Sequence, residues 1–496
     1  MKLTISDIIK ACDGEAHVAE AELNREVTCA GLDSRIIVDG GVFIAQNGEK
    51  VDGHSFIGQV YGKGAALVIT ELDPDQVERR YSTPASEWGN YIKVDDSLVA
   101  LKKIAKCYRE KLSIPVVGIT GSVGKTSTKE FIAGVLSEKY NVLKTEGNYN
   151  NEIGVPLTLL KIRQEHEVAV VEMGISDFGE MTRLSEMAQP DIAVITNIGQ
   201  CHLENLKTRD GILKAKTEIF SHMKKDGRVC LFGGDDKLVT VGIVNDLEPM
   251  FFGEESPKAL AAKVVDSSDN GLFGTTAKMK LNMPAKGIND TEISVNIPLP
   301  GHHMVINAAA AANVAMLLDL TPEQIKAGIE NMKPIGGRNN IVRLGDITLI
   351  DDCYNANPVS MKSSIDLLGL SNDRTIVVLG DMFELGENEE ELHRVVGRYA
   401  VSKGVNAIYT IGKLSENMYE AAREDWEREP KVIDEKGRTT DTICYWNSKE
   451  QFLKALEEDF SSGKREFIPA GSTILIKASH GMHFEEIVAK FKELSM

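Results

Sequence analysis

Short apolar runs alternate with longer amphipathic stretches along most of the chain, and this pattern predicts an α/β fold. From residue 113 onward, each β-branched run is followed by a polar or glycine-rich loop and then by apolar residues at helical spacing. The runs lie at residues 114–119, 167–171, 191–195, 347–350, 375–379, 407–411 and 473–477. This alternation of strands and helices is typical of doubly wound parallel sheets.

The first 112 residues have a different pattern of apolar and polar positions. Their apolar runs, at residues 41–45, 65–70 and 91–94, are separated by glycine-rich turns. Residues 97–112 then place apolar side chains at helical spacing. We expect a small α/β domain closed by a helix. Two polar clusters in it, Asp33-Ser-Arg35 and residues 52–56, are more typical of turns than of a binding site when each is taken alone.

The first run of the later region leads into Thr120-Gly-Ser-Val-Gly-Lys-Thr126, a glycine-rich loop between a strand and a helix. Inward-pointing backbone N–H groups and the helix N-terminus make such a loop a polyphosphate site. We expect Lys125 to neutralise the outer phosphates and Thr126 to bind Mg²⁺. A strict P-loop has a glycine five residues before Gly124, where Ile119 stands, so this loop is a variant. An ordinary turn between a strand and a helix is the alternative.

Length then suggests how these elements are grouped. At roughly 150 residues per domain, 496 residues predict three domains. We place them at residues 1–112, 113–335 and 336–496, the last boundary falling at Gly336-Gly-Arg338. The expected architecture is a central doubly wound, P-loop-type parallel sheet flanked by the small N-terminal α/β domain and a C-terminal Rossmann-like α/β domain. Residues 240–300 carry no recognisable motif.

Two further strand ends carry polar side chains. Glu172 follows the run at 167–171, and His202 follows the run at 191–195 after a short loop. Ligands in parallel sheets bind at the carboxyl ends of strands, so both residues should share a rim with Lys125. A carboxylate and an imidazole can both bind Mg²⁺, although magnesium prefers oxygen. A local hydrogen bond is the alternative for each residue alone; their convergence favours a metal site.

The pattern leaves two other residues ambiguous. Lys214 and Lys216 lie two apart on a predicted helix at 208–220, and periodicity does not say whether either faces the rim. Asn307 precedes an alanine-rich stretch at 308–318, where it is placed to cap a helix.

Composition narrows the class of protein. Apolar content of 42% with 26% charged residues is ordinary for a soluble protein, and a net charge of −18 argues against nucleic-acid or anionic-membrane binding. Seven scattered cysteines without paired spacing suit a reducing compartment. The N-terminus does not match a signal peptide, and the apolar stretch at 308–318 is too short to span a bilayer. We expect a soluble cytoplasmic monomer.

Taken together, the motifs resemble the Mur ligases of peptidoglycan synthesis. The matching runs follow one another along nearly the whole chain: Asp33-Ser-Arg35, Asp52-Gly-His54, Thr120-Gly-Ser-Val-Gly-Lys-Thr126, Gly147-Asn-Tyr-Asn-Asn151, Glu172-Met-Gly174, Asn197-Ile-Gly199, His202-Leu-Glu204, Ala215-Lys216, Asp351-Asp-Cys-Tyr-Asn-Ala-Asn-Pro358 and Leu379-Gly-Asp-Met-Phe-Glu-Leu-Gly386. The shortened phosphate loop is usual in this family. The runs at 354–358 and 380–386 resemble the branch that uses D-alanyl-D-alanine.

The resemblance implies an ATP-dependent amide ligase. In this branch, ATP phosphorylates the terminal carboxylate of a UDP-N-acetylmuramoyl-tripeptide, and the amine of D-alanyl-D-alanine attacks the acyl phosphate, releasing ADP and phosphate. The N-terminal domain is implied to hold the UDP end, the central domain ATP, and the C-terminal domain to help enclose ATP and the dipeptide. Lys125 and two Mg²⁺ ions would supply positive charge where the anions meet.

The resemblance also implies roles for individual residues. The catalytic residues would be Lys125, His202 and Lys216. The metal ligands would be Thr126, Glu172, His202 and Lys216, with a carbamate on Lys216 converting a cation into an oxygen ligand. The nucleotide would contact Gly121, Ser122, Val123, Gly124, Lys125, Thr126, Ser127, Asn307, Arg338 and Asp352. The other substrates would contact Ser34, Arg35, His54, Asn148, Asn151, Asn355 and Asn357.

Two departures from the family pattern affect these expectations. Met304 stands where a second asparagine is frequent, so adenine recognition would rest more on Asn307. Lys477-Ala-Ser-His480 replaces the usual Lys-Gly-Ser-Arg and so lacks a bidentate arginine. A sibling Mur-type or folylpolyglutamate-type ligase and a catalytically silent nucleotide-binding scaffold are the alternatives. The run at 354–358 argues against the first, and retention of the metal-site residues argues against the second.

Overall fold

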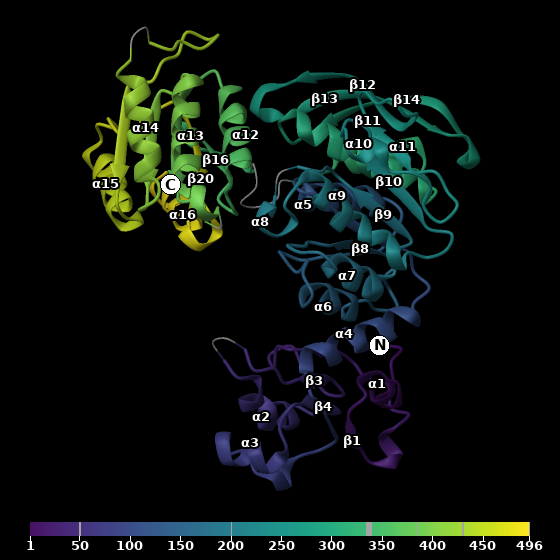
Figure 1. Cartoon of the computed structure of the whole chain (residues 1–496). Helices are drawn as coiled ribbons and strands as arrows, with labels where there is room; N and C mark the ends of the chain where they lie inside the picture. Colours follow the sequence, from purple (N-terminus) through teal and green to yellow (C-terminus); the bar gives the residue numbers. More distant parts are fainter. Residues whose placement is uncertain (49–50, 200, 334–339, 384, 429–430, 496) are drawn as a thin grey trace. The chain divides into compact units, whose positions relative to one another are not determined.

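The computed structural model describes residues 1–48, 51–199, 201–333, 340–383, 385–428 and 431–495. These residues form three mixed α/β parts, each built on one sheet (Figure 1). Each sheet with its helices is called a layer below: the N-terminal, the central and the C-terminal layer. The chain divides into two compact units, which are described separately. The first contains Met1–Val265, Lys278–Ser294 and Ile306–Ile329, and the second contains Asp266–Ala277, Val295–Val305 and Glu330–Met496.

The N-terminal sheet has the strand order β1-β5-β4-β3-β2. The β1–β5 pair is antiparallel, and the pairs β5–β4, β4–β3 and β3–β2 are parallel. Its strands are β1 Glu15–His17, β2 Ala30–Gly31, β3 Val42–Ile44, β4 Leu67–Thr70 and β5 Tyr91–Lys93. Its helices are α1 Ile5–Cys12, α2 Ile57–Gly62, α3 Pro74–Tyr81 and α4 Ser97–Glu110. The three strands and the closing helix predicted in this region are confirmed.

The central sheet has the strand order β14-β13-β12-β11-β10-β9-β6-β8-β7. Its strands are β6 Val116–Thr120, β7 Val142–Lys144, β8 Val168–Glu172, β9 Ile192–Ile195, β10 Arg228–Phe232, β11 Met250–Gly253, β12 Leu260–Asp269, β13 Thr275–Met283 and β14 Ile288–Ile297. Its helices are α5 Lys125–Leu136, α6 Gly154–Leu160, α7 Glu180–Ala188, α8 Leu203–Leu206, α9 Arg209–Thr217, α10 His302–Leu317 and α11 Pro322–Glu330. Strand β6 lies between β8 and β9 and is parallel to both, so the strand order reverses at β6. Ligands bind at such a reversal.

The segment that the sequence left without a motif forms the long strands β12 to β14. Buried and solvent-facing residues alternate along β13, from Thr275 to Met283. The period of two was present in the sequence as small or apolar residues alternating with polar ones, and it would have predicted a half-buried strand.

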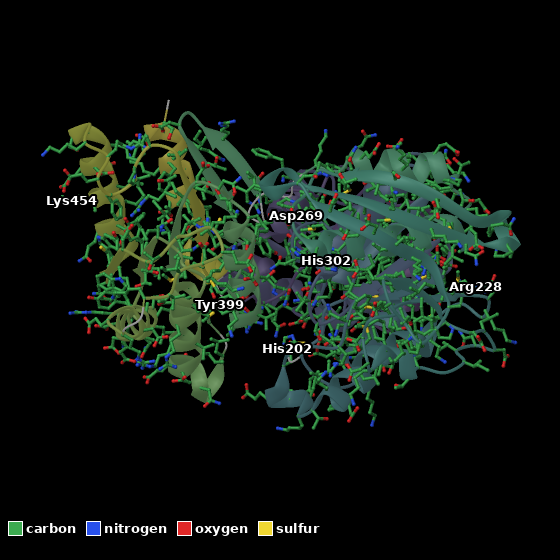
Figure 2. All side chains as sticks on the ribbon, turned by 90° about the horizontal axis from the view of Figure 1, so that it is seen from above. His202, Arg228, Asp269, His302, Tyr399 and Lys454 are labelled. Atoms are coloured by element: carbon green, nitrogen blue, oxygen red, sulfur yellow. The ribbon has the colours of Figure 1, made fainter. Side chains whose placement is uncertain are left out.

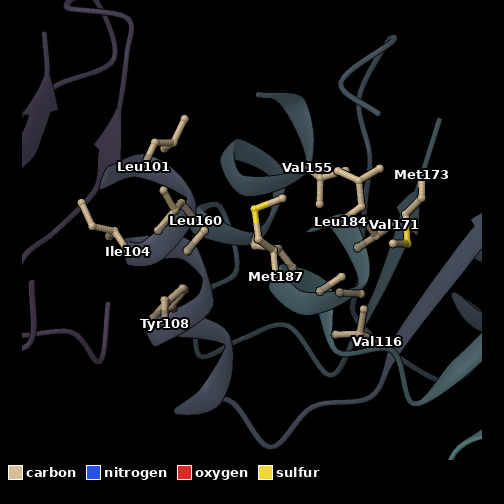
Figure 3. Close-up of a cluster of buried hydrophobic side chains, with 14 of the residues drawn as sticks. Leu101, Ile104, Tyr108, Val116, Val155, Leu160, Val171, Met173, Leu184 and Met187 are labelled. Carbon is tan, nitrogen blue, oxygen red and sulfur yellow. The ribbon is translucent and has the colours of Figure 1, made fainter. Parts of the chain in front are cut away.

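One apolar core packs helices α4, α6 and α7 against a face of the central sheet (Figure 3). Val116 and Val171 contribute from the strands, and Leu160 and Leu184 contribute from the helices. Complete burial of each such side chain stabilises the fold by roughly 1.5–3 kcal/mol. This packing fixes β6, and therefore the loop that follows it.

An ion pair between the buried Arg109 and the partly exposed Asp191 anchors the beginning of β6. The Arg109 guanidinium, at the end of α4, donates to Asp191 Oδ2 at 2.7 Å and to the carbonyl oxygens of Ala188 and Gln189. The same Asp191 oxygen accepts the backbone N–H of Val116 at 2.8 Å. The closing helix of the N-terminal layer is thus fixed to the strand that carries the phosphate loop.

The C-terminal sheet has the strand order β15-β16-β20-β17-β18-β19. The β15–β16 pair is antiparallel, and the pairs β16–β20, β20–β17, β17–β18 and β18–β19 are parallel. Its strands are β15 Asn340–Leu344, β16 Ile347–Asp351, β17 Arg374–Gly380, β18 Ala407–Ile411, β19 Thr442–Trp446 and β20 Ser472–Lys477. Its helices are α12 Pro358–Gly369, α13 Glu389–Ser402, α14 Glu416–Trp426, α15 Lys449–Ser462 and α16 Glu485–Leu494. Together the three layers confirm the predicted fold class.

Candidate active site

The loop between β6 and α5 requires glycine at two positions. Gly121 has φ 151° and Gly124 has φ 83°, both in the region that favours glycine. A Cβ on Gly121 would lie 1.9 Å from Thr196 Oγ1, which no side chain can accommodate. The loop therefore packs directly against the end of β9.

Three hydrogen bonds from the segment after β9 hold the loop at Val123. The Asn197 side chain accepts the Val123 N–H at 2.9 Å and donates to the Val123 carbonyl at 3.0 Å. Thr196 Oγ1 donates to the same carbonyl at 2.7 Å. Sequence reasoning assigned no role to Thr196 or Asn197. The Asn197-Ile-Gly199 run was the available signal, but only the fold shows that it faces the phosphate loop.

Lys125 is the first residue of α5 and lies over the loop. Its Nζ donates to the Gly121 carbonyl at 2.8 Å, and the side chain is half-buried. The ammonium and the helix N-terminus thus bring positive charge to the same loop.

Thr126 and Glu172 are in direct contact. Thr126 Oγ1 donates to Glu172 Oε2 at 2.9 Å, and Asn150 Nδ2 donates to Glu172 Oε1 at 2.8 Å. The Glu172 N–H donates to Thr145 Oγ1 at 2.9 Å, which fixes the end of β8. A hydroxyl and a carboxylate therefore converge at the strand ends. The sequence analysis does not predict Asn150 or Thr145; Asn150 lies inside the run at 147–151, for which the predicted contacts are Asn148 and Asn151.

His202 lies immediately before α8, with an exposed side chain (Figure 2). Its φ of 52° is unusual for a residue other than glycine. Strained backbone of this kind persists where the surroundings enforce it and is frequent at functional sites.

A cavity of about 590 Å³ lies beside the phosphate loop. Among the predicted site residues, Lys125, Asn151 and His202 line it. The other lining residues are Leu98, Lys102, Asn150, Glu152, Ile153, Gly174, Ile175, Ser176 and Glu180. Its volume lies within the range of small-molecule sites.

An ion-pair network that the sequence did not suggest forms part of this cavity wall. Lys102 of α4 lies 3.0 Å from Glu152, whose carboxylate also pairs with Arg183 of α7 at 2.5 Å. Burial alone would raise the pKa of Glu152, but hydrogen bonds from Arg183 and Lys102 outweigh it, and the pKa lies below its ordinary value.

The fold resolves the ambiguity between the two lysines of α9. Lys216 is 1% exposed, whereas Lys214 is exposed. Burial, with a smaller contribution from the charge of Lys125, lowers the pKa of Lys216 to about 7. The described residues provide no carboxylate partner for its ammonium. A substantial fraction of this amine is neutral near pH 7 and can act as a nucleophile.

The donors at the strand ends fit a hard cation in part. Thr126 and Glu172 offer the oxygen atoms that Mg²⁺ prefers, and His202 adds a nitrogen. Over the described ranges, no group of three or more His, Cys, Asp or Glu side chains is arranged for a metal. A lysine ammonium would repel the ion, so Lys216 fits the site only if it is modified to an anion.

Asn307 lies within α10 and does not cap it, so the alternative of a helix cap is wrong. Its Oδ1 accepts a hydrogen bond from Thr128 of α5 at 2.9 Å and lies 3.7 Å from the position that a Cβ on Gly124 would occupy. The expected capping position is internal because α10 begins earlier, at His302. Asn307 is therefore adjacent to the phosphate loop, and both Asn307 and Met304 are buried.

The substrate-binding residues predicted in the N-terminal layer differ in exposure. Arg35 is exposed and pairs with Asp33 at 2.8 Å, while Ser34 is buried and its carbonyl accepts Lys63 Nζ at 2.8 Å. His54 is 1% exposed. None of the three predicted residues lines the cavity among the residues that the structure describes.

Both ring nitrogens of His54 are hydrogen-bonded within the N-terminal layer. Its Nδ1 lies 2.6 Å from Asp52 Oδ1, and its Nε2 accepts the Glu71 N–H at 3.3 Å. Tyr81 donates to the other oxygen of Asp52. The His54 ring therefore stabilises the conformation of the loop around residues 52–56.

The two asparagines predicted in the 147–151 run are both exposed. Asn151 Oδ1 accepts the backbone N–H groups of Ile153 and Gly154 at the start of α6. Asn148 is solvent-facing.

In the second unit, Asp352 forms a buried ion pair. Lys477 Nζ donates to Asp352 Oδ2 at 2.6 Å and to the Asn355 carbonyl at 2.9 Å, and Ser364 donates to the same Asp352 oxygen at 2.5 Å. Asn355 and Asn357 are exposed, and the Asn357 side chain caps α12 by accepting the Ser360 N–H. Arg338 lies outside the described residues.

A glycine-rich phosphate loop at the reversal point of a parallel sheet, with a hydroxyl, a carboxylate and a lysine beside it, defines an α/β enzyme of the phosphate-loop class. The sequence also matches three family models in order. They are the Mur ligase family catalytic domain over residues 26–109, the Mur ligase middle domain over 119–315 and the Mur ligase glutamate ligase domain over 337–479. The chain belongs to the Mur ligase family and is a ligase.

Individual relatives agree with this assignment. The UDP-N-acetylmuramoyl-tripeptide--D-alanyl-D-alanine ligase of Bacillus subtilis is 35% identical over 459 residues, which cover 92% of this chain and 91% of the relative. A crystal structure of MurF from Acinetobacter baumannii superposes with a TM-score of 0.81 at 27% identity, covering 99% of both chains. MurF from Thermotoga maritima in complex with ADP gives a TM-score of 0.73 at 26% identity, covering 95% and 98%.

Proposed function

We propose that this chain joins D-alanyl-D-alanine to a UDP-N-acetylmuramoyl-tripeptide at the expense of ATP, in peptidoglycan precursor synthesis. The observation that carries the proposal is the placement of Lys125 and His202 on one cavity, next to the loop on which Thr126 contacts Glu172. An anionic substrate in that cavity would lie directly beside a bound polyphosphate. The relatives named above support the choice of both substrates.

The chemistry requires two anions to meet, and the residues of the site would compensate their charge. The phosphate loop would hold ATP through its backbone N–H groups, with Asn307 near the adenine. Lys125 would leave its contact with the Gly121 carbonyl and pair with the γ-phosphate as negative charge develops there. The substrate carboxylate attacks phosphorus and ADP leaves. The dipeptide amine then attacks the acyl carbon, loses a proton, and displaces phosphate to form the amide.

We also propose two Mg²⁺ sites. Thr126 would hold the first ion, and Glu172, His202 and a carbamate on Lys216 the second. Magnesium bound there would neutralise phosphate charge and orient the reacting oxygens. The carbamate forms when the neutral Lys216 amine adds to the carbon of CO₂: a new N–C bond is made, one C=O electron pair moves to oxygen, and a proton is released. The product replaces a cation with an anionic oxygen donor.

Further parts of the proposal concern the rest of the chain. We assign residues 1–112 to the UDP end of the substrate, residues 113–335 to ATP, and residues 336–496 to enclosing ATP and the dipeptide, with Arg338 and Asp352 toward the nucleotide. Ser34, Arg35, His54, Asn148, Asn151, Asn355 and Asn357 remain the proposed contacts to the other substrates. Among the described helices, none has both the length and the apolar character needed to cross a bilayer. We propose a cytoplasmic monomer.

A phosphate-release assay tests the proposal. Purified protein would be given ATP, Mg²⁺ and a UDP-N-acetylmuramoyl-tripeptide ending in lysine or diaminopimelate, with and without D-alanyl-D-alanine. We expect sustained phosphate release only when the dipeptide is present, with a matching UDP-linked pentapeptide detected by mass spectrometry. Sustained release that is independent of the dipeptide, or release driven by a single amino acid in its place, would contradict it.

A further inference from the structure

The hydroxyl of Thr120 is the last side-chain polar group of β6 before the phosphate loop. It is fully buried and has no hydrogen-bond partner in the part of the chain that the structure describes. Neighbouring threonines differ, since Thr126, Thr128 and Thr196 each donate a hydrogen bond. An unpaired buried hydroxyl is unfavourable, and valine would fill the same space without that penalty.

The register of the sheet shows which face Thr120 occupies. Thr120 pairs with Ile195 of β9, and paired residues point to the same side. Ile195 belongs to the apolar cluster that also contains Ile212, Ala215 and Ile219 of α9 and the following 3₁₀ turn. A Cβ on Gly118, two residues earlier on this face, would lie 3.3 Å from Ile219 Cδ1. The α9 segment therefore covers this face of β6.

Lys216 lies one helical turn before Ile219. The segment connects two parallel strands, β9 and β10, so it runs antiparallel to them. Three residues back, about 4.5 Å at the helical rise of roughly 1.5 Å per residue, leads from the level of Gly118 toward the carboxyl end of β6. That displacement is in the same direction as, and comparable to, the two strand residues, about 6.6 Å, that separate Gly118 from Thr120. Two buried polar groups, the Thr120 hydroxyl and the Lys216 amine, thus occupy one level between strand and helix.

We propose that Thr120 is a positioning residue whose hydroxyl donates a hydrogen bond to a carbamate oxygen on Lys216. The inference rests on the proposed function, because that function includes the carbamate. The hydroxyl would hold one carbamate oxygen, and the other would remain a donor for the proposed metal site with Glu172. Formation of the carbamate gives the buried hydroxyl an anionic acceptor, and the nearby Lys125 ammonium changes from repelling the lysine to attracting its modified form.

¹³C NMR of the full chain in ¹³C-labelled bicarbonate tests this inference. The wild type should show a carbamate resonance that Lys216→Ala abolishes. Thr120→Val should need about tenfold or more bicarbonate for half-maximal signal, the scale of one hydrogen bond to a charged group. Thr120→Ser, which keeps the hydroxyl, should remain close to the wild type. The bicarbonate dependence of ligase activity should shift in the same order.

Thr410→Val is the matched control. Thr410 of β18 is likewise fully buried with an unpaired hydroxyl, but it lies in the other unit. This variant should leave the bicarbonate midpoint unchanged. Circular dichroism would establish that each variant is folded, and Thr120→Ala would replace Thr120→Val if the latter is not.

The outcomes separate this inference from the proposed function. A wild-type carbamate signal with the same bicarbonate midpoint in Thr120→Val would overturn the role of Thr120 alone. If the wild type shows no Lys216-dependent signal while ligase activity is normal, the carbamate and the role of Thr120 both fail, yet the ligase assignment stands. Loss of the resonance in Thr410→Val as well would also overturn the inference, because the effect would not be local.

Discussion

Contacts with neighbouring strands restrict which residues can occupy single positions of the phosphate loop. Gly121 is required because of its contact with Thr196, and the Thr126–Glu172 hydrogen bond joins the loop to the next strand. Lys125 differs from these residues because its side chain is only half-buried. Its contribution should therefore appear in catalysis more than in folding.

We expect Lys125→Ala to lower the ligase turnover number by at least ~10²-fold, the scale of removing one electrostatic stabiliser from a reacting centre. Steady-state kinetics with saturating ATP would measure the effect. Lys214→Ala is the control, because Lys214 is an exposed lysine of α9. The thermal midpoint of both variants should stay near that of the wild type. Near-normal turnover in Lys125→Ala would contradict the catalytic role proposed for the lysine of the phosphate loop.

At the scale of elements, the strand ends of the C-terminal sheet are joined by a buried charge pair. Lys477 ends β20, and Asp352 follows the adjacent strand β16. Their side chains are 3% and 10% exposed. The loop after β20, which contains His480, is therefore anchored through Lys477.

We expect Lys477→Met to destabilise the protein by roughly 3–5 kcal/mol, because it leaves the Asp352 carboxylate buried without its partner. Chemical denaturation would measure the loss. Adding Asp352→Asn should recover part of it, since the uncompensated charge is then gone. Lys413→Met, an exposed position after β18, should change stability little. A Lys477→Met protein as stable as the control would contradict the view that this pair anchors the loop.

At the scale of the whole molecule, a net charge of −18 is carried by a chain whose acids are often paired with bases from another element. In the C-terminal layer, the Arg374 guanidinium donates to both Asp441 oxygens at 2.6 Å. These hydrogen bonds outweigh burial and hold the pKa of Asp441 below its ordinary value. Such pairs make stability depend on pH.

We expect acidification to lower the thermal midpoint of the C-terminal layer partly through this pair. Because folding lowers the pKa of Asp441, the pair stabilises the folded state above the ordinary carboxyl value of about 4. That stabilisation disappears as the pH falls toward the folded value. Asp441→Asn should therefore lower the midpoint at pH 7 and flatten its fall between pH 6 and 3 in calorimetry. Glu458→Gln, which removes an exposed pair with Lys454, should change neither the midpoint nor its fall with pH. An equal fall of the midpoint with pH in the wild type and both variants would contradict the proposed contribution of Asp441.

Much of the architecture follows from the sequence because strand and helix periods are local properties. The buried runs, the phosphate loop and the polar strand ends at Glu172 and His202 were all visible in the pattern. The long strands β12 to β14 were not among the predicted elements, although the alternation along β13 is an equally local property. The run at 147–151 could be noticed, but its spacing does not distinguish Asn150, which contacts Glu172, from its neighbours.

Only the tertiary structure decided which polar side chains meet. The sequence by itself determined an α/β fold with a variant phosphate loop, because glycine spacing and strand–loop–helix order are local properties of the chain. The ligase activity was implied by the resemblance of its motifs to the Mur ligases. Periodicity did not decide between Lys214 and Lys216, although the family resemblance favoured Lys216. The sequence also did not show that Asn197 holds the phosphate loop or that the α9 segment covers Thr120. Each of these depends on strand order and helix rotation, which are fixed by packing between segments far apart in the chain.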